Sequence, residues 1–460
     1  MLALGLAGCS MAPDYARPAP PVPPSWPAGD VYLRQSEAGL PAVSYREIFA
    51  DPRLQALAEQ ALVNNRDLRV AAANLAAARA QVRVVRAGQF PEVGVSAGVS
   101  NDSGTATRAE STSYSLSGGI SAFELDLFGR LASATEAQRQ AALATEAAAR
   151  TVRLGLIADI AIAWARHAAD AELLRIAEAT AESGRKTVTL SRARLKGGIA
   201  PRTELRQAEQ ILATAEADVA AQKTALAQDA NLMDLLVGAP VDRALLPTDL
   251  GAVLASVRVL PAGTSSEVLL RRPDVLQAEY RLRAANADIG VARAELFPRI
   301  SLTGLLGLAS ESLASLFTGD AFHTTVGADA SYAIFSGGGA GANLAVSKAQ
   351  RDAALASYEK VLQTAFREVA DALARQGTID DELRAVTMRT EAAADSAQLT
   401  QARYRGGVAS SLENLDAQRS YYTAQRSLVA ERLTVVSNRV TLYRALGGDE
   451  AVASGSIPGR

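Results

Sequence analysis

The chain has 460 residues, and its 47 lysines and arginines nearly balance its 49 aspartates and glutamates. Both signs are interleaved, so the sequence has no basic stripe that could follow a nucleic-acid backbone, and a nucleic-acid partner is excluded. Aromatic residues make up only 5%, and much of the 48% hydrophobic content is alanine, which favours closely packed helices. No run of about 18 apolar residues occurs, so no helix is predicted to span a membrane.

The only cysteine ends residues 1–9, in the tetrapeptide Leu6-Ala7-Gly8-Cys9. This tetrapeptide resembles the lipobox of bacterial lipoproteins, in which the cysteine is acylated and becomes the N-terminus after cleavage. We therefore predict that Cys9 is lipidated; the alternative is a free thiol near a disordered terminus. A secretion signal normally has a basic start and about 15 to 30 residues, so we expect the true signal to begin upstream of Met1.

A proline-rich stretch begins residues 10–51, with seven prolines from Pro13 to Pro27. This composition predicts an extended, semi-rigid tether from a lipid anchor to the folded body. The rest of residues 10–51 is predicted to be an N-terminal segment around the middle, or equator, of the molecule. Ser10, directly after the cysteine, favours sorting to the outer membrane.

The remainder of the chain consists of two repeats. At an offset of 207 residues, Gln89-Phe90-Pro91 aligns with Leu296-Phe297-Pro298, and Leu127-Phe128-Gly129 aligns with Ile334-Phe335-Ser336. The offset is 209 farther along, where Arg194-Leu195-Lys196-Gly197-Gly198 meets Arg403-Tyr404-Arg405-Gly406-Gly407. We assign the repeats to residues 52–240 and 267–446. An equatorial insert at 241–266 joins them, and an equatorial C-terminal tail at 447–460 follows.

Apolar residues spaced three and four apart predict long helices in both repeats. A heptad seam in the long helix of the second repeat predicts left-handed supercoiling against a partner helix. The helices at 201–237 and 267–295 together match the length of 130–196, so we expect them to stack end to end beside it. The predicted helices are 53–88, 130–196 and 201–237 in the first repeat and 267–295, 341–405 and 411–446 in the second.

Strands with alternating apolar residues are predicted at 92–100, 113–124, 299–308 and 324–335. Alternation over about ten residues, with Ser, Thr and Gly on the other face, is typical of membrane β-strands. The alternative is two soluble amphipathic hairpins. Four strands are too few to close a barrel, and an open edge is not tolerated in lipid, so several chains must share one barrel. Two chains would give a barrel filled by side chains, whereas three give enough strands for a channel, which predicts a homotrimer.

With its lipobox, duplicated helix-strand-strand-helix order, Phe-Pro breaks and glycine-containing tips, the sequence resembles the TolC-like outer-membrane efflux factors. The resemblance is to their lipoprotein branch, which includes OprM- and NodT-type channels. It implies a mainly α fold with a small β part, in which the trimer forms a twelve-stranded transmembrane β-barrel continuous with a long periplasmic α-helical barrel.

The same resemblance implies a function. The chain would be the outer-membrane channel of a tripartite efflux system, a passive duct gated at its periplasmic helical tips. A periplasmic adaptor and an inner-membrane pump of the RND type would engage it. The protein would be lipid-anchored in the bacterial outer membrane, in contact with its lipid, with a long periplasmic portion.

The two tips differ in charge, because Glu204 aligns with Glu413 but Gln207 aligns with Asp416. Acids three apart share a helix face, so Glu413 and Asp416 would form stacked acidic rings in a trimer. The alternative is a solvated helix start, where carboxylates suit the helix dipole. In the family that the chain resembles, matching acids narrow the periplasmic entrance. The implied gate consists of Leu412, Glu413, Asp416 and Arg419, with Arg403 and Arg405 as candidate ion-pair partners.

The turns between the helices are predicted to dock the adaptor. The residues assigned to this surface are Arg194, Leu195, Gly197, Gly198 and Ile199 in the first hairpin and Gly406 and Gly407 in the second.

No catalytic constellation is predicted. The only histidines, His167 and His323, lie far apart in the pattern, which leaves a histidine metal site or catalytic triad unsupported. The glycines at 337–341 lack the spacing of a dinucleotide-binding loop, so we expect them to form a chain bend. We therefore predict no enzyme activity, no cofactor and no metal. The alternative from another class is a coiled-coil envelope lipoprotein with a structural role and no pore.

Overall fold

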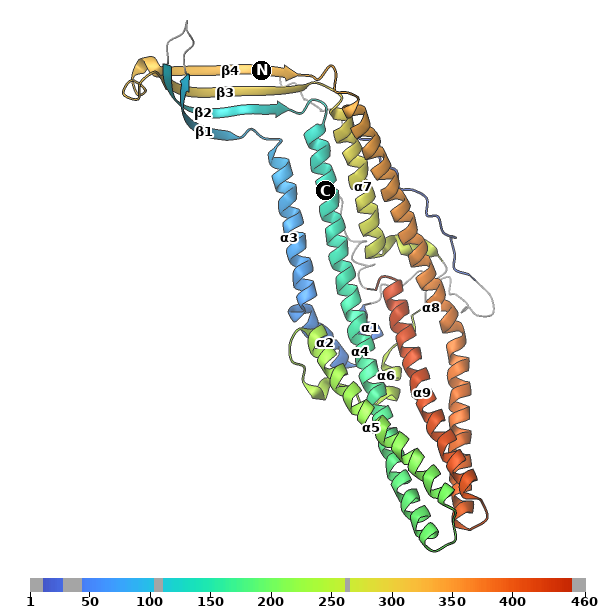
Figure 1. The fold of residues 1–460 in the computed structure, drawn as a ribbon. Helices are drawn as coiled ribbons and strands as arrows, with labels where there is room; N and C mark the ends of the chain where they lie inside the picture. Colours follow the sequence, from blue (N-terminus) through green and yellow to red (C-terminus); the bar gives the residue numbers. More distant parts are fainter. Residues whose placement is uncertain (1–10, 28–43, 103–110, 261–264, 449–460) are drawn as a thin grey trace. The chain divides into compact units, whose positions relative to one another are not determined.

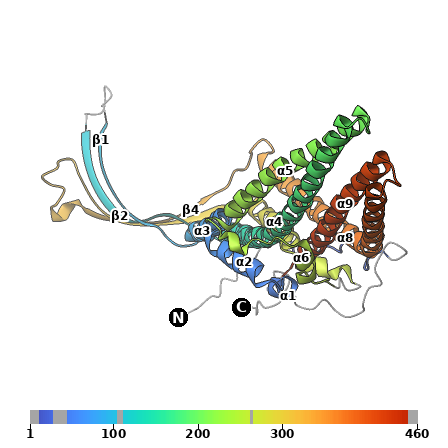
Figure 2. The same ribbon diagram turned by 90° about the horizontal axis from the view of Figure 1, so that it is seen from below.

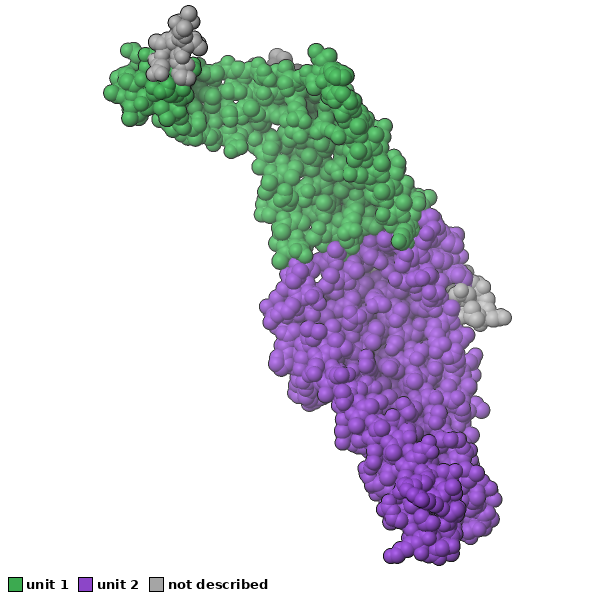
Figure 3. All heavy atoms as spheres, viewed as in Figure 1, with its two compact units in different colours: residues 1–19, 73–147, 276–360 green, residues 20–72, 148–275, 361–460 purple. Residues whose placement is uncertain are grey.

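The computed structural model describes residues 11–27, 44–102, 111–260 and 265–448. The predicted lipidation site, Cys9, and most of the predicted C-terminal tail lie outside these residues. The chain divides into two compact units (Figure 3). Unit 1 comprises Met1–Ala19, Ala73–Ala147 and Leu276–Lys360, and unit 2 comprises Pro20–Ala72, Ala148–Val275 and Val361–Arg460. Each unit therefore takes segments from both sequence repeats, and neither repeat forms a unit alone.

The sheet of unit 1 is antiparallel and has the order β1-β2-β3-β4 (Figure 1). Its strands are β1 (Val93–Asp102), β2 (Ser111–Leu125), β3 (Arg299–Ser310) and β4 (Phe322–Ser331). All four predicted strands are present, but β4 ends at Ser331, four residues before the predicted end. Apolar side chains on the sheet, such as Val95 and Val326, are largely exposed to solvent in the single chain.

A bulge in β2 bends this sheet. The register between β2 and β3 shifts between Ile120 and Phe123, and Ala122 adopts a positive φ of 54°. Gly119 has a φ of 149°, and a Cβ there would lie only 2.2 Å from the carbonyl oxygen of Gly304. Because a bulge increases local twist, the strands curve strongly along their length, as Figure 2 shows.

Four helices run through both units: α3 (Arg66–Ala87), α4 (Arg130–Lys196), α7 (Pro273–Ala294) and α8 (Gly339–Arg405). The bounds of α4 coincide with the predicted range, and α8 starts two residues earlier than expected. Gly337 and Gly338, directly before α8, have φ values of 61° and 84°, which only glycine adopts easily. Within the described part of the chain, no helix combines the length and hydropathy that a bilayer-spanning helix requires.

The segment after the predicted lipid anchor lies along α7 in unit 1. Asn286 donates to the carbonyl of Pro13 at 2.7 Å, and Arg293 donates to that of Met11 at 3.0 Å. Arg17 pairs with Glu279 at 2.8 Å, and the Tyr15 hydroxyl donates to the same carboxylate at 3.3 Å. Residues 11–17, which we call the strap, are therefore extended as predicted, but they are docked on a helix.

The other α-helices of the described residues lie within unit 2. They are α1 (Tyr45–Ile48), α2 (Pro52–Asn64), α5 (Arg202–Val237), α6 (Leu250–Ser256) and α9 (Ser411–Ala445). The described ranges also contain the 3-10 helices η1 (Arg243–Leu245) and η2 (Ser266–Arg271) in unit 2, and η3 (Gly319–Ala321) in unit 1. Part of the predicted insert packs on the long helices, because Trp164 of α4 donates to Leu245 O and Arg439 of α9 donates to Val257 O.

The prediction of one continuous helix over 53–88 is wrong. Asn65 leaves the helical conformation (ψ 136°), and its side chain donates to Leu236 O while accepting from Leu68 N. It therefore ends α2 and caps α3. The predicted helix 267–295 is likewise interrupted, because Arg272 precedes Pro273 and a residue before proline disfavours the helical conformation. Asn65 and Arg272 are separated by the repeat offset of 207, so both repeats break at the same place.

Candidate functional site: the helical tips

The two turns predicted to dock the adaptor share one construction. In the first, Gly198 has a φ of 71°, and Ile199 N donates to Arg194 O at 3.0 Å. In the second, Gly407 has a φ of 75°, and Val408 N donates to Arg403 O at 2.9 Å. Left-handed glycines with such backbone bonds satisfy the last carbonyls of a helix. The double glycines therefore end α4 and α8 in the same way.

The turns expose apolar side chains at equivalent positions. Ile199 and Val408 are 71% and 72% exposed, and Leu412, the second residue of α9, is 62% exposed. Arg194 and Leu195 differ from this pattern. Arg194 donates to the Tyr404 hydroxyl at 2.8 Å, and Leu195 packs against a small core of Val188, Leu205, Ala208 and Leu415. Of the residues assigned to docking, these two are thus engaged within the chain.

The predicted gate acids lie on the solvent side of α9. Glu413 and Asp416 are exposed, whereas Asn414 and Leu415 between them are buried. Ser410 caps the helix by accepting from Glu413 N at 3.2 Å. Asp416 pairs with Arg419 at 2.5 Å, and both side chains remain more than half exposed. Among the described residues, Arg403 and Arg405 form no ion pair with either acid, so their predicted pairing stays a prediction for neighbouring chains.

Glu204, the equivalent of Glu413 in the first repeat, has a different environment. It is only 7% exposed and accepts hydrogen bonds from the Tyr404 hydroxyl at 2.9 Å and from Ser191 Oγ at 3.2 Å. The Arg194 guanidinium also lies over the Tyr404 ring, 5.3 Å from its centroid. Burial, and then the Glu204 carboxylate, raise the pKa of Tyr404. We call Ser191, Arg194, Glu204 and Tyr404 the tip cluster.

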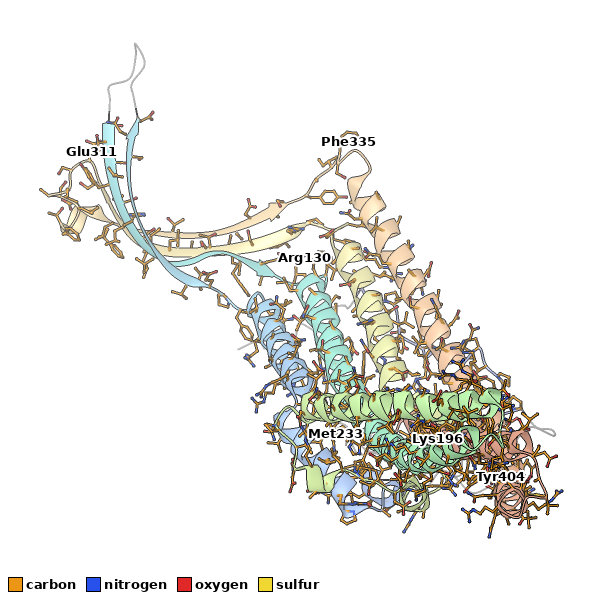
Figure 4. All side chains as sticks on the ribbon, turned by 60° about the horizontal axis from the view of Figure 1, so that its bottom comes forward. Arg130, Lys196, Met233, Glu311, Phe335 and Tyr404 are labelled. Atoms are coloured by element: carbon orange, nitrogen blue, oxygen red, sulfur yellow. The ribbon has the colours of Figure 1, made fainter. Side chains whose placement is uncertain are left out.

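The tip cluster joins the two hairpins within one chain, because Ser191 and Arg194 end α4, Glu204 begins α5 and Tyr404 ends α8. Figure 4 shows Tyr404 and Lys196 near each other at these helix ends. Alignment of the two repeats matches Glu204 to Glu413 but predicts no partner for it. An alignment of repeats shows which positions are equivalent, whereas burial depends on which helix packs over each of them.

A second polar link connects the hairpins farther from the turns. The Tyr422 hydroxyl of α9 donates to Asp218 Oδ2 of α5 at 2.6 Å, and Arg426 donates to the same oxygen at 3.1 Å. Burial, and then the Asp218 carboxylate, raise the pKa of Tyr422. Sequence reasoning missed Asp218, Tyr422 and Arg426. Their only signal is a helical spacing of four between a tyrosine and an arginine, which many surface helices show.

Two carboxyl groups face each other between α4 and α5. Asp229 is 3% exposed, and Arg166 lies 3.3 Å from its Oδ1 and 3.7 Å from Asp170 Oδ2. Burial, and then the neighbouring Asp170 carboxyl, raise the pKa of Asp229 to about 7. This pair therefore holds a proton near neutral pH. The described residues contain no group of three metal-ligating side chains.

Comparison with known proteins identifies the class to which these features belong. The sequence model of the outer membrane efflux protein family matches residues 57–239 and 264–448, two segments that correspond to the two repeats. The chain belongs to this family. The fold class expected from the sequence is confirmed, since the chain is mainly helical with a small sheet and resembles solved outer-membrane channels.

Particular relatives extend over nearly the whole chain. It is 40% identical to a probable efflux pump outer membrane protein, TtgC of Pseudomonas putida, over 96% of this chain and 93% of that protein. It is 36% identical to the cation efflux system protein CusC of Escherichia coli K12, over 97% and 98% of the two chains. The structure of the open state of the Neisseria gonorrhoeae MtrE outer membrane channel superposes on this chain with a TM-score of 0.86 at 33% identity, covering 96% of this chain and 98% of that one.

Proposed function

We propose that this protein is the outer-membrane channel of a tripartite efflux system and acts as a passive trimeric export duct. Family membership supports the efflux role. The observation that carries the pore is the four-stranded sheet of unit 1, whose apolar side chains are exposed and whose outer strands, β1 and β4, have no further strand beside them in the described chain. In lipid such edges must be paired, and three copies would close a twelve-stranded barrel.

The partners follow from the tips and the N-terminus. Ile199, Val408 and Leu412 expose apolar surface where a periplasmic adaptor would dock, with an RND-type inner-membrane pump beyond it. Gly197, Gly198, Gly406 and Gly407 shape these turns. Lipidation of Cys9 would anchor the strap in the outer membrane. The proposed cargo-conducting role needs no catalytic group, cofactor or metal.

The gate is proposed to lie at Glu413 and Asp416, with Leu412 and Arg419 beside them. Both acids are exposed on α9 and would recur in three chains around one axis. Repulsion among like charges at close range is unfavourable, so cations or arginines such as Arg403 and Arg405 of neighbouring chains would stabilise a narrow state. Opening would move the second hairpin away from the first, which requires breaking the tip cluster and the Asp218 link.

The test is single-channel conductance in planar bilayers. Wild-type protein should show a small, cation-preferring conductance that increases in the Glu413→Ala, Asp416→Ala double variant. A matched control is Glu178→Ala with Glu182→Ala, two exposed acids of α4 far from the turns in sequence. An unchanged conductance would place the constriction elsewhere. No conductance from inserted, trimeric protein would favour the non-pore envelope lipoprotein.

A further inference from the structure

An aromatic stack marks the place in unit 1 where the first repeat meets the second. Phe128, which follows β2, stacks on Phe297, which precedes β3, with ring centroids 4.7 Å apart and planes inclined by 17°. Phe128 belongs to the first repeat and Phe297 to the second. The same boundary joins β2 to β3 in the sheet.

The duplication supplies each of these rings with a counterpart. At the offset of 207, Phe128 corresponds to Phe335, and Phe297 corresponds to Phe90. Phe335 is 89% exposed, on the loop between β4 and α8 (Figure 4), and Phe90 is 58% exposed. Phe90 and Phe297 occupy the same local structure, a turn after a helix followed by proline. The same pair of rings is thus stacked at one boundary and separate at the other.

The neighbouring elements show the same asymmetry. In unit 1, α7 buries Leu282, Ala287 and Ile289, whereas α3, which lies wholly within the described residues, buries no side chain. The strands show the same asymmetry as the helices: β2 and β3 are paired with each other, whereas β1 and β4 are the edges of the sheet. Surfaces equivalent to those that are in contact where the two repeats meet are therefore exposed at β1 and α3 and at β4.

We propose that a second copy of this chain covers this side, with Phe335 of one copy stacked on Phe90 of the next. The proposal rests on the trimer of the proposed function and names its contact. In each chain, Leu125 of β2 pairs with Ile300 of β3. The offset converts that pair into Tyr332 of one copy beside Val93 of the next, which sets the register at the helical end of the shared edge.

Disulfide crosslinking tests the register. Paired residues on antiparallel strands have Cα atoms about 4.5–5.5 Å apart, within the range of a disulfide. The Tyr332→Cys, Val93→Cys double variant should therefore form covalent dimers and trimers on oxidation, reversed by reductant. The matched control, Tyr332→Cys with Val99→Cys, places the second cysteine six residues along the same strand and should stay monomeric on denaturing gels. Each single variant shows whether Cys9 contributes.

A double-mutant cycle tests the stack. Phe335→Ala and Phe90→Ala should each lower the temperature at which the detergent-solubilised trimer dissociates by several degrees. Combining them should lower it little further, because residues in contact are not additive. Phe317→Ala removes a ring that is 72% exposed in the β3–β4 connection, away from this side, and should leave the temperature unchanged.

The outcomes separate this contact from the assembly on which it rests. If light scattering shows that the wild-type protein is not a trimer, the proposed assembly fails. A wild-type trimer without the Tyr332 to Val93 crosslink, or with additive effects of the two phenylalanine substitutions, would overturn the contact alone. In that case the two rings would face lipid or solvent independently.

Discussion

The Tyr404 hydroxyl donates a hydrogen bond of 2.9 Å to the buried carboxylate of Glu204 and so joins the end of α8 to the start of α5. Leaving a buried carboxylate without its donors costs free energy, so this bond favours the arrangement in which the hairpins touch. The corresponding acid of the second hairpin, Glu413, is exposed and has no such restraint.

Replacing Tyr404 with phenylalanine removes the hydroxyl and little else. A hydrogen bond to a charged group contributes about 1.5–3 kcal/mol, so Tyr404→Phe should raise the open fraction of the channel by roughly tenfold or more. Single-channel recording measures this directly. Tyr421→Phe is the control, because that ring is also on the second hairpin and, among the described residues, its hydroxyl forms no hydrogen bond to the first hairpin. Equal open fractions in the two variants would show that the hydrogen bond from Tyr404 to Glu204 does not hold the channel closed.

Asp229 predicts a pH dependence of stability. Its pKa is raised from 3.8 to about 7 in the folded chain, so the folded state binds a proton that the unfolded state releases. Stability is therefore greatest below about pH 4 for this group and falls as the pH rises towards 7, by at most about 4 kcal/mol. Asp229→Asn should flatten the fall in melting temperature between pH 5 and 7.5.

Asp234 provides a control of opposite sign. Burial alone would raise the pKa of Asp234, but hydrogen bonds from Arg243 and from Val241 N outweigh it and lower the pKa. Its stabilisation is present above the unfolded pKa and is lost only in acid. Asp234→Asn should therefore leave the slope between pH 5 and 7.5 as in the wild type. A flattened slope in both variants would mean that Asp229 is not the responsible group.

The strap depends on the carboxylate of Glu279. This side chain is 2% exposed and pairs with Arg17 at 2.8 Å and Arg283 at 2.6 Å. Glu279→Gln leaves two partly exposed cations without their counterion, and we expect a loss of about 1–3 kcal/mol with faster proteolysis within residues 11–17. Asp14→Asn changes an exposed acid of the same strap and should alter neither. Unchanged proteolysis in Glu279→Gln would show that the other contacts hold the strap.

Gly290 predicts a steric cost at the same place. A Cβ there would lie 2.6 Å from Ser133 Oγ and 2.8 Å from Ala12 N, whereas a Cβ at Gly155 of α4 would meet nothing within 4 Å. Alanine is favoured over glycine by about 1 kcal/mol inside a helix, so Gly155→Ala should raise the melting temperature. Gly290→Ala should lower it, because the strap must shift. If both raise it, the strap is not packed as described.

The tips and the breaks in the helices show where sequence reasoning stops. The bounds of α4 were predictable because Gly129 precedes the helix and Gly197-Gly198 follows it, and these signals are local. The break at Asn65 was missed, because helical periodicity continues through it and the chain leaves the helix through a hydrogen bond to Leu236 O, far along the sequence. At Arg272 a local signal, Pro273, is present, and the predicted helix 267–295 does not take it into account.

The difference in environment between Glu204 and Glu413 could be predicted only in part from the sequence. Aligning the repeats reveals that both hairpins begin with an acid and that only the second adds Asp416. Whether an acid is buried depends on side chains from other helices, here Tyr404 and Ser191. Contacts between residues far apart in the sequence produce no periodic pattern in it. The tip cluster and the contacts of Asp218 with Tyr422 and Arg426 can therefore be recognised only in the structure.

The unequal use of two equivalent acids has a consequence for symmetry. A ring of three chains contains six repeats of common origin. At the sheet, the contacts between successive repeats, within a chain and between chains, would be nearly alike, which gives the ring approximate sixfold symmetry there. The tips are not alike. In each chain Glu204 of the first hairpin is buried and bonded to Tyr404, whereas Glu413 of the second hairpin is exposed. Docking proteins would therefore meet two alternating kinds of tip, and a partner with six similar units could bind three of them differently from the other three.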